Sequence, residues 1–153
     1  MLKLAPQAGP LPQSNTDTMA WVSEIRIGIE VASSPYPGIN TDGPWVTVSD
    51  HGNNAGIVLG AVVKPANWGE LDEIMVEMFI DGHSVGKAST ASMLDGPFGA
   101  VRFALANLKS RGIAPQNGLW ISTGAITGVH EIALGQSATA RFAGLGAISV
   151  NID

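Results

Sequence analysis

The sequence predicts an α+β domain that is mostly β-strand, and three observations carry this prediction. Short alternating or β-branched segments recur along the chain, turn-forming residues separate them, and only one stretch has a clear helical stripe of apolar residues. The 153 residues include 19 Gly and 9 Pro, which favours many turns between short strands. Because helices do not alternate with the strands, a Rossmann-type parallel sheet is excluded.

Composition narrows the classes of function. The net charge is −5 and no basic cluster occurs, so nucleic acid is not expected as a partner. The absence of Cys excludes disulfides and thiolate metal sites. The longest apolar run, residues 55–63, is too short to cross a bilayer, and Pro residues interrupt any signal-peptide pattern, so we expect a cytoplasmic protein. Charged residues make up only 14% of the chain, which leads us to expect a homo-oligomer that buries apolar surface.

The first half of the chain is expected to hold an arm and two strands. Residues 1–18 contain three Pro and a polar run, so we expect an extended, weakly ordered N-terminal arm, followed by a single domain over 19–153. Strict alternation from Ile25 to Val31 predicts a half-buried strand. A Pro-rich loop should follow over 33–44, residues 45–50 are ambiguous, and the β-branched run 55–63 predicts a strand buried on both faces.

The second half is expected to hold a hairpin, the main helix and three short strands. Asp81-Gly82 is a strong hairpin signal between strands at 74–80 and 84–91. The helix should begin at Asp95 or Gly96 and end at Gly112, with an apolar stripe of Phe98, Val101, Leu105 and Leu108. The short strands are expected at 119–123, 138–143 and 147–152.

Three polar segments are candidates for chemistry, although common catalytic motifs are absent. Glu30 ends the alternating strand beside a Pro-rich loop, where a cation or proton-transfer site is often built; a solvated edge carboxylate is the alternative. Residues 50–54, which include Asp50, His51, Asn53 and Asn54, form a polar cluster that could face a substrate or could simply form an Asx turn. Ser122, Thr123 and Gly124 could bring backbone N–H groups to an anion or form an ordinary turn.

Taken together, six ordered segments resemble the fumarylacetoacetate hydrolase superfamily, within it the branch of 2-oxopent-4-enoate hydratases and 4-oxalocrotonate decarboxylases. The resemblance covers residues 20–153, and thus the C-terminal core of that family. The segments that carry it are IGIEVASS (27–34), SDHGNNAGIVLG (49–60), FIDGHSVGKAS (79–89), GPFGAVRFALANLKSRG (96–112), GLWISTGAIT (118–127) and LGQSATARFAGLGAISVNI (134–152).

The resemblance implies a mixed β-roll that binds Mg²⁺ or Mn²⁺ and the 2-oxo acid end of a substrate. In the family, an E-x-E pair and a third acidic residue hold the metal. Glu30 matches the third ligand, whereas the arm 1–18 contains no Glu that could supply the pair. The family's Gly-Asp turn near the C-terminus is Gly135-Gln136 here, and its Asp-Asn pair is Asp50-His51.

Three hypotheses about function follow. The first is a lyase or hydratase-like enzyme acting on an enolisable 2-oxo acid or β-dicarbonyl compound. In it Glu30, Asp50 and His51 are catalytic, while Asn53, Ser122, Thr123 and Gly124 bind the substrate. The second is a metal-independent cyclase, isomerase or binding protein on the same fold. The third is a non-catalytic partner of a longer paralogue. From its strand-end position and its match to the family's third ligand, we expect Glu30 to line the principal pocket near Asp50 or His51.

Overall fold

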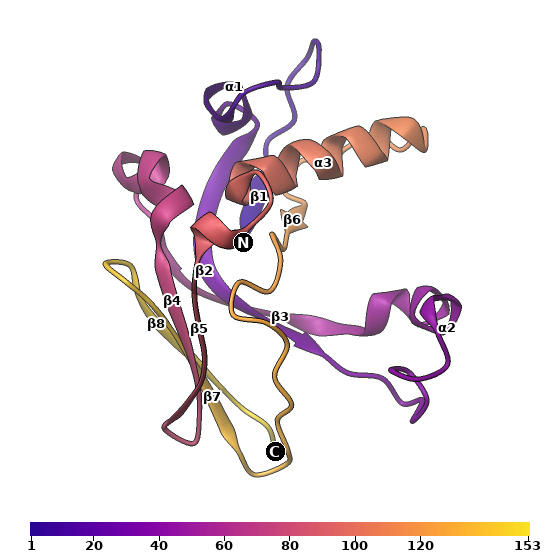
Figure 1. The fold of residues 1–153 in the computed structure, drawn as a ribbon. Coiled ribbons are helices and arrows are strands. Elements are labelled where there is room, and N and C mark those ends of the chain that lie inside the picture. The colour runs from indigo at the N-terminus through magenta and orange to yellow at the C-terminus, as the bar shows by residue number, and fades with distance from the viewer.

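The structure is a computed structural model that describes residues 1–153, and its centre is two antiparallel four-stranded sheets (Figure 1). The first sheet has the order β3-β2-β1-β6 and the second the order β5-β4-β7-β8. This architecture confirms the mostly-β α+β class predicted from the sequence. The strands are β1 (Leu2–Leu4), β2 (Val22–Ala32), β3 (Asn54–Val62), β4 (Met75–Ile80), β5 (His83–Ser89), β6 (Trp120–Ile121), β7 (Ser137–Phe142) and β8 (Gly146–Asn151).

Helices are few and mostly short. The α-helices are α1 (Asn15–Met19), α2 (Pro44–Ser49) and α3 (Gly96–Ser110), and the 3-10 helices are η1 (His51–Asn53), η2 (Pro65–Glu73) and η3 (Thr90–Ser92). None of them combines the length and the apolar character that a membrane-crossing helix needs.

The N-terminal residues differ from the extended, weakly ordered arm expected over 1–18. Leu2–Leu4 form β1, which lies inside the first sheet and pairs antiparallel with β2 on one side and β6 on the other. Leu2 and Leu4 are 1% and 0% exposed, because the inward face of β1 packs on the core. Ser14 then caps α1 through a capping box with Asp17. The Pro residues that predicted disorder lie between these two elements, not within them.

The second sheet confirms the predicted hairpin. Asp81 and Gly82 have φ of 48° and 80°, the two positive values that a type I′ turn requires. β4 pairs antiparallel with β5 through this turn and with β7 on its other edge, and β8 follows β7. The predicted strands 138–143 and 147–152 correspond to β7 and β8 within one residue at each end.

The predicted helix is α3, and it closes the core. Pro97 lies in its first turn, and Gly112, just beyond its end, has a φ of 68°. Phe98, Val101 and Leu105 are each at most 1% exposed and pack with the inward-facing isoleucines of β2. The amphipathic pattern therefore predicted both the helix and its buried face.

β3 and the connection before it depart from expectation. The run 55–63 was predicted to be buried on both faces, yet no residue of β3 is fully buried. The prediction is wrong because only one face of the first sheet packs on the core. The connection 33–53 between β2 and β3 contains α2, in which no residue is buried, and it projects from the body of the molecule (Figure 1).

Candidate functional site

Three segments of the chain meet at Glu30: the end of β2, the start of β3 and the residue that follows β6. Glu30 lies near the end of β2, where its side chain is exposed and points to the face opposite the buried isoleucines. The Asn54 amide nitrogen donates a hydrogen bond to one carboxylate oxygen over 3.0 Å. The Ser122 hydroxyl donates to the other oxygen over 2.8 Å. The carboxylate is therefore held in position from both sides, and each oxygen keeps a lone pair for a further partner.

The structure separates the two Asn residues of the predicted polar cluster. Asn54, at the start of β3, is the residue that contacts Glu30, whereas the predicted substrate-binding residue is its neighbour Asn53. Asn53 belongs to η1, has a φ of 51°, and uses its carbonyl to accept the N–H of Ser33. The signal that could have identified Asn54 is its strand position, because it is the first residue to pair with the end of β2.

Asp50 and His51 are not joined to Glu30 by any hydrogen bond or ion pair. Asp50 caps the C-terminal end of α2 and is half-buried, while His51 is exposed and has a φ of 52°. Both residues belong to the tight turn that leads into β3, in which the N–H of Asn53 donates to the carbonyl of Asp50. The turn is thus closed by backbone groups, and the side chains of Asp50 and Asn53 do not accept a backbone N–H as they would in an Asx turn.

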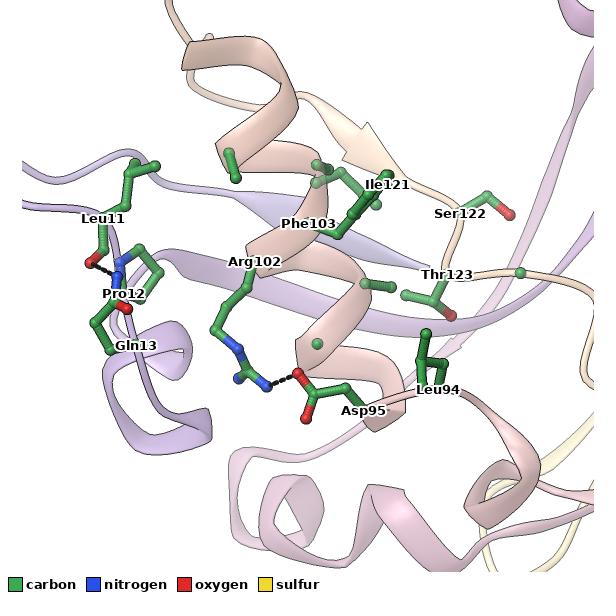
Figure 2. A pocket seen from close by; sticks show the side chains of 15 residues that line it. Leu11, Pro12, Gln13, Leu94, Asp95, Arg102, Phe103, Ile121, Ser122 and Thr123 are labelled. Atoms are coloured by element: carbon green, nitrogen blue, oxygen red, sulfur yellow. Dashed lines mark hydrogen bonds and ion pairs between the residues drawn. The ribbon is translucent and has the colours of Figure 1, made fainter. Parts of the chain in front are cut away.

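The segment after β6 offers donors next to Glu30. Ser122 follows β6 directly, and its hydroxyl faces Glu30, whereas Thr123 lies toward the start of α3 (Figure 2). The backbone N–H groups of Thr123 and Gly124 have no hydrogen-bond partner within the chain. Gly124 has a φ of 122°, which an L-residue rarely adopts, so the turn depends on glycine. Unpaired N–H groups of this kind can receive a carboxylate or a developing oxyanion.

A large, open cavity lies beside α3 and not over Glu30. It has a volume of about 780 Å³. Its walls come from residues 11–13, from residues 94–95 and α3, and from residues 121–124 (Figure 2). Glu30, Asp50 and His51 do not line it, so the expectation that Glu30 lines the principal pocket is wrong. Ser122 connects the two regions, since it lines the cavity and also binds the Glu30 carboxylate.

Arg102 is the basic residue in this cavity, and its guanidinium is already engaged. It forms an ion pair with Asp95 and donates to the Asn15 side chain over 2.6 Å and to Thr18 over 3.3 Å. Figure 2 shows Arg102 and Asp95 facing each other along α3. The guanidinium therefore stabilises the packing of α1 against α3 and has little capacity left for an anionic ligand.

The residues around Glu30 do not fit a complete site for Mg²⁺ or Mn²⁺. Such cations require about six oxygen ligands, commonly including several carboxylates. Here one carboxylate and one hydroxyl oxygen are present, and Asn54 presents its amide nitrogen. No group of three or more acidic or His residues occurs anywhere in the chain that could hold a metal ion. The donor set of this chain is thus too small to bind such a cation by itself.

Comparison with known proteins shows which proteins the chain is similar to. No protein-family profile matches the chain. A 4-oxalocrotonate decarboxylase of Pseudomonas putida is 29% identical over 133 residues, which make up 87% of this chain and 50% of the relative. The structure of 4-oxalocrotonate decarboxylase from Pseudomonas putida G7 with magnesium and adipate superimposes with a TM-score of 0.84 at 26% identity, covering 99% of this chain and 57% of that one. The chain is similar in sequence and fold to 4-oxalocrotonate decarboxylases, which are proteins of the fumarylacetoacetate hydrolase superfamily.

Two further solved structures extend the comparison. The same decarboxylase with calcium and acetate gives a TM-score of 0.82 at 26% identity and is covered over 56% of its length. A 5-carboxymethyl-2-hydroxymuconate delta-isomerase from Mycobacterium smegmatis gives a TM-score of 0.66 at 17% identity, which shows a shared fold. The resemblance drawn from the six sequence segments is thereby confirmed at the level of the superfamily.

The chain matches only part of the length of these similar proteins. The chain spans about half the length of the curated decarboxylases that it matches. Divalent cations are bound in the decarboxylase structures, whose chains are nearly twice as long as this one. The small donor set around Glu30 is consistent with a chain that corresponds to only part of such a protein.

Proposed function

We propose that this chain forms a small-molecule site in which Glu30 moves a proton at the enolisable carbon of a 2-oxo acid or β-dicarbonyl compound. The observation that carries the proposal is that Asn54 and Ser122 each donate a hydrogen bond to one oxygen of the exposed Glu30 carboxylate. A carboxylate that is fixed in place but open to solvent can act as a general base without first losing a competing ion pair. The kinship with decarboxylases of a 2-oxo acid supports the choice of substrate class.

The proposed enolisation uses only side-chain and backbone groups of this chain. Glu30 takes the proton from the carbon next to the keto group, and the C–H electrons pass into the carbonyl to give an enolate. The free N–H groups of Thr123 and Gly124 would stabilise the enolate oxygen or the substrate carboxylate. Glu30 then returns the proton to carbon. Enolisation of this kind is common to isomerisation, hydration and decarboxylation of such substrates, so the proposal names the shared step.

Glu30→Gln tests the proposal. The amide keeps the volume and can still accept from Ser122, but it has lost the basicity, so we expect the rate to fall about 10²–10⁴-fold. The readouts are exchange of the C3 protons of 2-oxobutanoate with deuterium, followed by proton NMR, and loss of the enol absorbance of a β-dicarbonyl. Glu70→Gln is the matched control, because Glu70 is exposed and has no ion-pair partner. Equal exchange rates in wild type and Glu30→Gln would remove Glu30 from the chemistry.

Divalent metal forms a separate arm of the same experiment. The donor set leads us to expect that EDTA leaves the exchange rate of this chain unchanged. A rate that requires added Mg²⁺ or Mn²⁺ would instead favour a role for Glu30 as a metal ligand, with the remaining ligands supplied from outside the groups described above.

A further inference from the structure

The segment after β6 links the Glu30 carboxylate to the cavity beside α3. The Ser122 hydroxyl donates to Glu30, and Ser122, Thr123 and Gly124 together form one wall of the cavity (Figure 2). A substrate whose carboxylate or enolate oxygen accepts from the N–H groups of Thr123 and Gly124 is therefore flanked by Glu30 and by this cavity. The cavity is thus the space available to the rest of such a substrate.

The wall of the cavity is largely apolar. Leu94 and Phe103 line it together with Ile121. Leu94 is 95% and Phe103 72% exposed, so both present apolar surface to whatever occupies the cavity. Helix α3 adds three alanines to the same wall, Ala100, Ala104 and Ala106. An alkyl or aryl group that covers these side chains is stabilised in proportion to the apolar area that it removes from water.

The cavity offers no free cation. Arg102 and Asp95 are the only charged residues that line it, and they form an ion pair with each other. The Arg102 side chain is only 16% exposed and donates two further hydrogen bonds within the chain. The next cation along α3, Lys109, lines a separate hollow that also contains Asp17. A carboxylate at the far end of a substrate would lose hydration in this cavity without gaining a counter-ion.

We propose that the substrate of this site has one polar end and an apolar alkyl or aryl tail, and that the tail lies in the cavity beside α3. The polar end, a 2-oxo acid or β-dicarbonyl group, binds at the N–H groups of Thr123 and Gly124, with its enolisable carbon toward Glu30. The inference rests on the proposed function, because the position of the polar end is taken from it. It adds a selection, since an apolar tail is favoured over one that ends in a second carboxylate.

A series of 2-oxo acids tests this selection. 2-Oxobutanoate, 2-oxohexanoate and 2-oxooctanoate share the polar end and differ only in the length of the tail. Each added CH₂ should lower the dissociation constant about two- to fourfold, because it is buried in the cavity. 2-Oxoadipate has the chain length of 2-oxohexanoate, with a carboxylate in place of the terminal methyl group. It should bind at least about tenfold more weakly than 2-oxohexanoate.

Titration of the backbone amide NMR signals measures binding without relying on turnover. The signals of Thr123 and Gly124 should shift with all three monocarboxylates. Those of Ala100 and Phe103 should shift with 2-oxohexanoate and 2-oxooctanoate and much less with 2-oxobutanoate. Absence of any shift at Thr123 and Gly124 would overturn the proposal, as would 2-oxoadipate binding as tightly as 2-oxohexanoate.

Exchange of the C3 protons with deuterium, measured on the same samples, reports the chemistry of Glu30 separately. Binding that strengthens with the tail but is not accompanied by exchange would contradict the role of Glu30 and still support the tail site. Exchange that depends on Glu30, with dissociation constants that do not change along the series, would contradict the tail site alone.

Two substitutions at Phe103 test the cavity wall. Phe103→Ser removes apolar surface from an exposed side chain, and it should reduce the preference for 2-oxooctanoate over 2-oxobutanoate about fivefold. Phe103→Lys supplies the missing cation, and it should raise the affinity for 2-oxoadipate relative to 2-oxohexanoate about tenfold. Val129→Ser is the control, because Val129 is 85% exposed and lies outside the cavity, so it should keep the wild-type preferences. Wild-type preferences in both Phe103 variants, with the fold intact by circular dichroism, would overturn the proposal.

Discussion

Gly60 of β3 lies close against a buried isoleucine of each sheet, and replacing it with Ala should measurably destabilise the fold. A Cβ at this position would lie 2.9 Å from Ile27 of β2 and 3.0 Å from Ile148 of β8. Both isoleucines are buried, at 3% and 9% exposure, so neither can move into solvent. The added methyl group must therefore push the sheets apart or force a side chain out of its preferred rotamer.

The expected cost is about 2 kcal/mol, within the range found for overpacked cores. For a chain of this size that lowers Tm by about 4–8 °C. Gly69→Ala makes the same chemical change at a position where a Cβ would meet nothing within 4 Å, so it should be neutral or raise stability by up to about 1 kcal/mol. Urea unfolding followed by circular dichroism measures both variants. If Gly60→Ala were as stable as Gly69→Ala, the close packing of Ile27 and Ile148 across β3 would be refuted.

Two further predictions concern the second sheet and α3. The Ser137 N–H and the Gln136 amide lower the pKa of Asp81 below its ordinary value, so its contribution to stability is present above about pH 4 and is lost as the pH falls further. Asp81→Asn should therefore flatten the loss of stability of the chain in acid, which unfolding midpoints measured between pH 2 and pH 6 would reveal. Leu105→Ala removes a side chain that is 1% exposed and should cost about 2–5 kcal/mol in urea unfolding; a cost below 1 kcal/mol would contradict the packing of α3 described here.

The elements that the sequence predicted well are those whose local pattern agrees with their environment. The Asp81-Gly82 turn needs two positive φ values, and few other dipeptides allow them, so the hairpin could be read from two residues. The stripe from Phe98 to Leu105 repeats with helical spacing and is buried on that same face. In both cases the short-range signal and the tertiary structure favour the same conformation.

The elements that were misjudged depend on contacts with distant parts of the chain. Nothing in the sequence around Leu2–Leu4 indicates a central strand, because its partners are β2 and β6, and β6 lies more than a hundred residues away. The run 55–63 is apolar along its length, yet its environment is set by a sheet that packs on one side only.

Only part of the candidate site followed from the sequence. That Glu30 is a candidate functional residue could be inferred from its place at the end of an alternating strand and from the family resemblance. Its pairing with Asn54 instead of Asn53 depends on the register between β2 and β3, which shifts at Ala32. The contact with Ser122 joins residues 92 positions apart and is set by the fold as a whole. Side-chain pairs across such separations cannot be derived from local periodicity.

The position of β1 between β2 and β6 has a consequence for the order in which the chain can fold during synthesis. The hairpin of β2 and β3 can form as soon as residue 62 has left the ribosome, but the far edge of β1 has no partner until residues 120–121 appear. The nascent first sheet therefore exposes an open strand edge while residues 63–119 are translated, which favours aggregation or chaperone binding. We expect the pairing of β1 with β6 to be the slowest step in folding of the first sheet. Refolding of the complete chain should then be limited by a contact between residues far apart in the sequence.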